Sequence, residues 1–160
     1  AGTIRTSWKS TRSRSAGRPT ADQGRTARWL LASADYGDKD PELRFYDPLA
    51  LSSAGGTAST GAVVARLPST GFVQSLHYDA SRDLLVLIQN RRAGRGWRLT
   101  LVSLGPSLET GALQVVDVLE PNLPGELEGF HFVDGTRAVM LTSDRVRNAY
   151  VGTLAAKTVR

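Results

Sequence analysis

Cysteine is absent from this sequence of 160 residues, so disulfides and thiolate metal sites are excluded. Long apolar runs are absent too: the longest is the strand-sized segment Leu84–Ile88, against the roughly 18 apolar residues of a membrane-spanning helix. Helical periodicity is sustained nowhere, and neither the Gly-x-Ser-x-Gly motif nor the phosphate-binding Gly-x-x-x-x-Gly-Lys loop occurs. These absences exclude a disulfide scaffold and leave no catalytic signature to follow.

The composition is that of an ordinary globular domain. Hydrophobic residues make up 41% of the sequence and charged residues 22%, and a chain of this length can bury one substantial core. Residue 1 is alanine, which fits either a leader removed during secretion or a piece of a longer protein.

The net charge of +5 is concentrated at the N-terminus. Residues 1–28 contain seven basic residues against Asp22, a balance of +6, whereas the remainder has 13 basic and 14 acidic residues, a balance of −1. We therefore divide the chain into an N-terminal strand with a basic, poorly ordered arm (1–28) and a blade-like domain (29–160). The arm is expected to be a solvated linker, because no aromatic residues are interleaved with its arginines. Contact with nucleic-acid phosphates is the alternative.

The most informative pattern is a repeat of about 54 residues. Leu76–Asn90 can be laid without a gap on Phe130–Asp144, which matches His77 with His131. A third copy follows at a spacing of 55, with Trp29–Asp35 falling on Leu84–Asn90. A fixed period of this size is typical of propeller blades and solenoid units.

Strand signals recur within each unit, as short runs of β-branched and aromatic residues bounded by turn formers. The predicted strands are 29–34, 43–46 and 62–67, then 72–78, 84–89, 97–104 and 113–119, then 127–133, 138–142 and 149–154. The innermost strand of the first unit is expected near Ala21–Arg25, and the third unit lacks a fourth strand. We predict an all-β fold of about three four-stranded antiparallel blades, a partial or half β-propeller.

The missing strand has a candidate at the other end of the chain. Thr3–Trp8 reads as a strand, and we expect it to complete the last blade of another copy, as in rings closed by an N-terminal strand. Three blades do not close a ring, since propellers have roughly four to eight. The expected partner is therefore a second copy or a missing half of the propeller. A sandwich or an irregular barrel is the competing architecture.

Strand direction assigns the expected ligand site to one face. The starts of the inner strands and the ends of the second strands lie on the same side of a blade array, so polar residues there should surround one site. These candidate ligand-binding residues are Asp35, Asn90, Asp144, Arg92 and Arg145. Guanidinium groups suit small anions or carbohydrates, although salt bridges with the neighbouring acids would use the same groups.

A calcium site is a second expectation on this face. Asp38 lies in an acidic loop and Glu128 begins an inner strand, and calcium takes six to eight oxygen ligands. The alternative is a solvated acidic turn.

Histidine and tryptophan each carry two interpretations. His77 and His131 occupy equivalent inner-strand positions, where structural hydrogen bonding is favoured over catalysis. Trp97 begins a strand beside Arg95 and Arg98; sugar stacking is one reading, and burial between blades is the commoner one.

The stretch 124–144 resembles the blade opening of phytase-like esterases and gluconolactonase-type propellers: Glu-Gly, an apolar strand, Asp-Gly, a second strand, then Ser-Asp. The segment Asp35–Asp47 is similar to the loop and third strand that follow in those families. The resemblance covers about 40 residues and implies that Glu128 reaches a calcium ion in the channel, whereas Gln74 departs from the pattern one blade earlier.

Together these observations favour a non-enzymatic β-propeller-type ligand-binding or scaffold module. A calcium-dependent phosphoesterase or lactonase is the alternative that the resemblance implies. The source compartment and the ligand do not follow from the residues.

Overall fold

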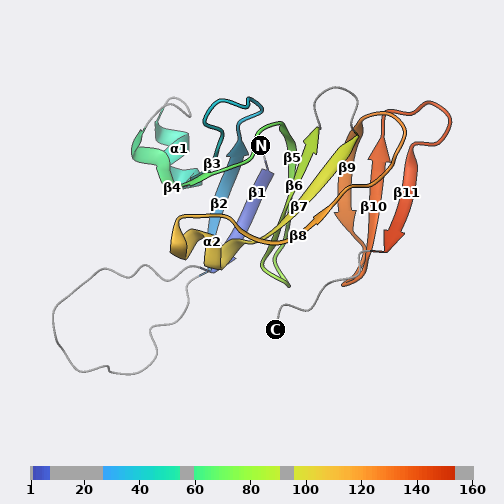
Figure 1. Ribbon diagram of the computed structural model, residues 1–160. Helices are drawn as coiled ribbons and strands as arrows, with labels where there is room; N and C mark the ends of the chain where they lie inside the picture. The colour runs from blue at the N-terminus through green and yellow to red at the C-terminus, as the bar shows by residue number, and fades with distance from the viewer. Residues whose placement is uncertain (1, 8–26, 55–59, 91–95, 154–160) are drawn as a thin grey trace.

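The computed structural model of the chain describes residues 2–7, 27–54, 60–90 and 96–153. These residues form three small antiparallel sheets and two short α-helices (Figure 1). The all-β expectation is therefore confirmed. Within the described residues, no helix has the length and apolar character needed to cross a membrane.

The first sheet has the strand order β1-β2-β3-β4. Its strands are β1 (Gly2–Ser7), β2 (Ala27–Ala34), β3 (Glu42–Tyr46) and β4 (Val63–Pro68). Helix α1 (Pro48–Ser53) and the 3₁₀ turn η1 (Thr60–Ala62) lie between β3 and β4. Asp47 starts α1, because its carboxylate accepts hydrogen bonds from the backbone N–H groups of Leu49 and Ala50.

The second sheet repeats this plan with the order β5-β6-β7-β8. Its strands are β5 (Val73–Asp79), β6 (Leu84–Asn90), β7 (Trp97–Ser103) and β8 (Gln114–Leu119). A second short helix, α2 (Leu104–Thr110), again connects the third strand to the fourth, and it ends at Gly111, whose positive φ of 72° suits glycine. Neither helix was predicted, because six or seven residues are too few to show a helical period.

The third sheet has three strands, in the order β9-β10-β11. These are β9 (Leu127–Phe132), β10 (Arg137–Thr142) and β11 (Ala149–Thr153). The described residues thus contain three of the four strands of a complete blade, as the sequence predicted for this unit.

The three sheets pack in chain order around two hydrophobic cores. The first core joins the first two sheets and contains Leu30, Phe45, Leu85 and Leu87 among others. The second core joins the second and third sheets through residues such as Val86, Leu99, Phe130 and Met140. The first strands are neighbours, since β1 contacts β5 and β5 contacts β9. Strand β6 of the second sheet lies between the two cores. Six of the seven residues of β6 are therefore buried, and the first five of them are apolar.

The N-terminal strand corrects one prediction. β1 pairs antiparallel with β2 in its own first sheet, with Ile4 opposite Leu30, and does not complete the third sheet. It takes the place expected for Ala21–Arg25, a segment that lies outside the described residues together with most of the basic arm. The physical reason is that β2 needs a hydrogen-bonding partner on its inner edge, and the segment 2–7 has the strand character that 21–25 lacks.

The gap-free repeat is also corrected, by one residue. His77 lies opposite Val86 in the second sheet, and its repeat mate His131 lies opposite Val139. The two valines are 139 − 86 = 53 positions apart, whereas the histidines are 131 − 77 = 54 apart. The pairing register of β10 therefore differs by one residue from that of β6, its match in the sequence repeat. A register shift of one residue moves each side chain to the opposite face of the sheet.

Candidate functional site

The predicted ligand residues that the structure describes lie at one end of the molecule. The second strands β2, β6 and β10 all run toward this end (Figure 1), and Asp35, Asn90 and Asp144 lie at or just after their last residues. These residues come from three different sheets. The loops that begin β5 and β9 reach the same end, because those strands run antiparallel to β6 and β10.

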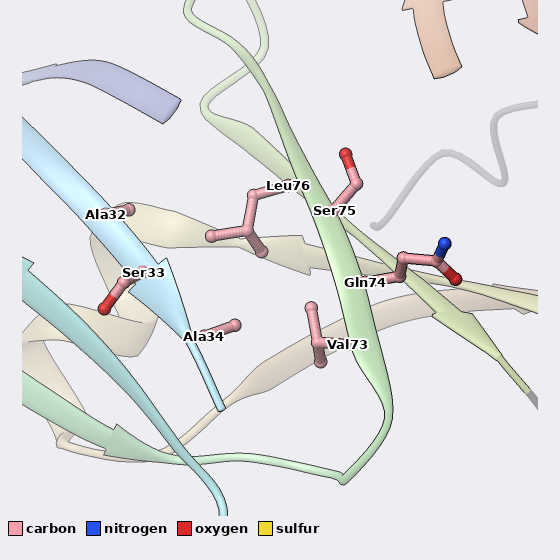
Figure 2. A pocket seen from close by; sticks show the side chains of 7 residues that line it. All are labelled: Ala32, Ser33, Ala34, Val73, Gln74, Ser75 and Leu76. Carbon is pink, nitrogen blue, oxygen red and sulfur yellow. The ribbon is translucent and has the colours of Figure 1, made fainter. Parts of the chain in front are cut away.

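A cleft of about 210 Å³ opens here between the first and second sheets. It is lined by the end of β2 (Ala32 to Ala34) and the start of β5 (Val73 to Leu76). Figure 2 shows Val73 and Leu76 directed toward Ala32 and Ala34, whereas Gln74 points away from β2. The cleft therefore has an apolar floor of small side chains, and Gln74 lies at its edge with its side-chain amide directed away from β2.

The rim is held by contacts between two loops. Phe72 donates its backbone N–H to the carbonyl oxygen of Tyr36 at 2.9 Å, and the two rings meet edge to face with centroids 5.8 Å apart. A Cβ at Gly71 would lie 2.7 Å from the carbonyl oxygen of Gly37 and 2.9 Å from the Cα of Asp38, so only glycine permits this approach. The acidic loop after β2 is thereby fixed against the start of β5.

Asp35 is occupied by a structural ion pair. Its two carboxylate oxygens accept hydrogen bonds from both terminal nitrogens of Arg44, at 2.9 and 2.8 Å, and one of them also accepts the backbone N–H of Glu42. Glu42 continues the network to Arg66, and these two arginines hold the pKa of Glu42 below its ordinary value although desolvation opposes them. Of the two roles considered for Asp35, ligand binding and a salt bridge, its contacts with Arg44 match the salt bridge.

Asp144 is occupied by a turn. Its carboxylate accepts the backbone N–H groups of Arg147 and Val146, and these two bonds keep its pKa below the usual range. Arg145, in the same turn, is exposed. Asn90 donates its backbone N–H to the carbonyl oxygen of Phe72, which ties the end of β6 to the start of β5. Arg92 lies outside the described residues.

The two predicted calcium ligands belong to different sheets. Asp38 is exposed in the loop after β2, and Glu128 is exposed in β9, beside the irregular pairing of β9 with β10. In the part of the chain that the structure describes, no three histidine or carboxylate side chains gather closely enough to hold a metal ion. These residues remain predictions, with no convergent donor set around them.

A buried polar network that the sequence did not reveal supports the cleft from behind. The side-chain nitrogen of Gln89 donates to the Thr70 hydroxyl at 2.7 Å and to the Gly71 carbonyl oxygen at 2.9 Å, while its oxygen accepts from Thr100 at 2.6 Å. Every polar atom of the Gln89 amide is thus engaged, which a buried amide requires. The network anchors the crossover from β4 to β5.

Trp97 has the structural role that the sequence favoured. Its ring is 4% exposed within the second core, and its indole nitrogen donates to the carbonyl oxygen of Gly125 at 2.9 Å. This bond joins the third strand of one sheet to the loop that begins the next.

A second groove, of about 370 Å³, lies at the opposite end between the first turns of the second and third sheets. His77 and His131 meet there with ring centroids 5.2 Å apart, and His77 also packs within 5.6 Å of the Phe130 and Phe132 rings. Burial, and then the neighbouring His131, lower the pKa of His77. The two histidines contact each other through their rings, and hydrogen bonding by them stays a prediction. Only the adjacency of β5 and β9 could have revealed this contact.

Arg82 closes this seam. It donates to Asp79 at 2.6 Å and to the Gly135 carbonyl oxygen at 2.7 Å, and its guanidinium carbon lies 3.9 Å from the centre of the Phe132 ring. One arginine thereby links the first turn of the second sheet to the first turn of the third by a hydrogen bond and a cation–π contact.

Comparisons of this chain with protein-family models, with curated proteins and with solved structures found no match. Its function is therefore argued from its own geometry.

Proposed function

We propose that the chain is a non-enzymatic ligand-binding or scaffold module of the β-propeller type. The observation that supports this most is the ordered packing of three antiparallel meanders whose first strands are neighbours and whose second strands end on the same side. In propellers this arrangement surrounds a central channel, and ligands bind at the loops around it. The cleft between β2 and β5 opens among those loops.

The cleft suits a small carbohydrate or anion that has one apolar part. Its floor consists of methyl and isopropyl groups, and the exposed Gln74 on its rim sits where the pairing of β5 with β6 is irregular. Irregularities of this kind frequently redirect side chains beside binding sites. The carboxylates of Asp35 and Asp144 serve loop structure, so the proposal assigns recognition to the residues that line the cleft, with Gln74 at its edge.

The test is a nuclear magnetic resonance titration of the ¹⁵N-labelled chain with N-acetylglucosamine and, separately, with citrate. Saturable shifts confined to Ala34, Val73 and Gln74 are expected for at least one probe. Gln74→Ala should weaken that binding about tenfold, which corresponds to one lost hydrogen bond of ordinary strength. Gln114→Ala, at another exposed glutamine, is the matched control and should change nothing. Shifts scattered over the surface, or none with either probe, would contradict the proposal.

A further inference from the structure

The second and third sheets each contain an equivalent row of paired residues, and the two rows differ in how far their residues are buried. The rows are defined by the strand pairing and consist of His77, Val86 and Leu101 in the second sheet and of His131, Val139 and Val151 in the third. The second-sheet row faces the third sheet, and Val86 and Leu101 are 0% and 7% exposed. In the third sheet, Val139 and Val151 lie on the face opposite the core residue Met140, and Val151 is 72% exposed, whereas His131 contacts the ring of His77 in the second sheet. Leu141, which occupies the place of the buried Ile88, is 48% exposed.

In the part of the chain that the structure describes, the other face of the first sheet carries exposed apolar side chains. Helix α2 follows β7 and places Leu104, 0% exposed, in the core against the first sheet. Helix α1 follows β3 in the same position of the first sheet, and its Leu49, 104 − 49 = 55 positions earlier, is 81% exposed. Trp29 of β2 is 55% exposed and lies on the face of β2 opposite the core residue Leu30. The exposed face of the third sheet and the exposed face of the first sheet therefore correspond to the two kinds of face that pack together in both internal cores.

We propose that the outer face of the third sheet binds the outer face of the first sheet in a second copy of this chain. The inference rests on the proposed propeller-type function and names the partner of that module. In each internal interface, the face of one sheet that points toward the next sheet in the chain packs on the near face of that next sheet. The same arrangement would place Leu141 and Val151 of the third sheet against Trp29 and Leu49 of the first sheet in another copy. Two copies contain six sheets, so a head-to-tail contact that closes after two copies would give a ring within the range of known propellers.

Charge does not oppose the contact. Among the described side chains, the outer face of the first sheet carries a network of two acids and two bases that are paired with one another: Asp35, Glu42, Arg44 and Arg66. Docking on these four side chains therefore covers acids and bases that already neutralise one another.

The experiment is light scattering on the full chain after size exclusion, over a range of concentrations. The wild type should show twice the 17.2 kDa mass of one chain. Val151→Lys and Leu49→Glu, each at an exposed position on one of the two faces, should each raise the dissociation constant at least a hundredfold. Val115→Lys on β8, 51% exposed and outside both faces, is the control and should leave the mass unchanged. Circular dichroism confirms that each variant is folded.

Mixing the two disruptive variants identifies the contact. In a head-to-tail pair, the mixture contains one wild-type interface and one Lys–Glu interface, so the double mass should return. A face-to-face pair of third sheets would respond to Val151→Lys alone, and that result would overturn the proposal. A wild-type chain of single mass at all concentrations would overturn it too, while the titration of the cleft would still decide the proposed function independently.

Discussion

The second and third sheets are built from similar strands, yet they differ in how many of their residues are buried. In β6 six of seven residues are buried, because the first sheet covers one face and the third sheet covers the other. In β10 buried and less buried residues alternate, since the face toward the second sheet packs in the second core while Leu141 on the other face is 48% exposed. The difference shows that position in the array, and not strand composition alone, decides which residues form the core.

The largest effect should come from truncating matched residues of these two strands. Ile88→Ala removes a fully buried side chain and should lower the free energy of unfolding by about 2–5 kcal/mol. Leu141→Ala, at the corresponding place in the third sheet, should cost about 1 kcal/mol or less in the dilute chain, because the side chain is already half exposed. Urea unfolding measures both. Equal costs would show that the third sheet is covered on both faces.

A smaller effect should follow from the bond that joins the two sheets. Trp97→Phe keeps most of the buried ring but leaves the Gly125 carbonyl oxygen without its donor, at a cost of about 1–3 kcal/mol. Trp29→Phe is the matched control on an exposed ring and should cost less than about 0.5 kcal/mol. Chemical denaturation distinguishes them, and indistinguishable midpoints would argue against the bond.

The ion pair of the first sheet should contribute less again. A double-mutant cycle with Asp35→Asn and Arg44→Gln should give a coupling energy of about 1 kcal/mol or less, because both side chains are about one-third exposed and screened by solvent. The coupling should decrease as salt is added. A vanishing coupling combined with lost ligand binding would instead make Asp35 a ligand residue.

The histidine seam should make stability depend on pH. The pKa of His77 is lowered in the folded chain, so the unfolded chain binds the proton first and stability falls as pH drops below about 6.5. Thermal melting between about pH 7.5 and pH 5.5 should show this fall, and His77→Phe should flatten it. An unchanged slope in the variant would assign the effect to other groups.

Calcium should have the smallest effect of all. The proposed non-enzymatic function predicts a melting temperature that ignores both added calcium and a chelator. A rise with calcium that the chelator reverses would revive the phosphoesterase or lactonase alternative, since an ion that binds only the folded chain stabilises it. Glu128→Gln would then be the variant to examine, with Glu109→Gln as its control.

Strand positions were predictable because short apolar runs and turn formers are local signals. The predicted 84–89 corresponds to β6 (Leu84–Asn90), and the predicted 138–142 corresponds to β10 (Arg137–Thr142). Register was not predictable at the level of one residue. Leu30 and Leu85 match in the repeat, but they lie in the same core, on facing sheets. A shift of one residue in strand pairing changes the face on which a side chain lies, and similarity between the repeats does not reveal such a shift.

Strand direction made it predictable which loops lie together, but the contacts that their residues make were not predictable. The end of the molecule followed from strand direction, and the cleft lies there. The roles of Asp35 and Asp144 were not readable, because a carboxylate in a loop suits a ligand, an arginine or a pair of backbone amides equally well until its neighbours are known.

The sequence by itself determined the all-β class, the order of the meanders and the absence of disulfides, since these depend on local patterning and composition. Only the tertiary structure decided that β1 pairs with β2, that His77 meets His131, and that Leu141 and Val151 of the third sheet are exposed. Those features depend on which strands become neighbours in space, and neighbours far apart in the chain are selected by the packing of the whole array.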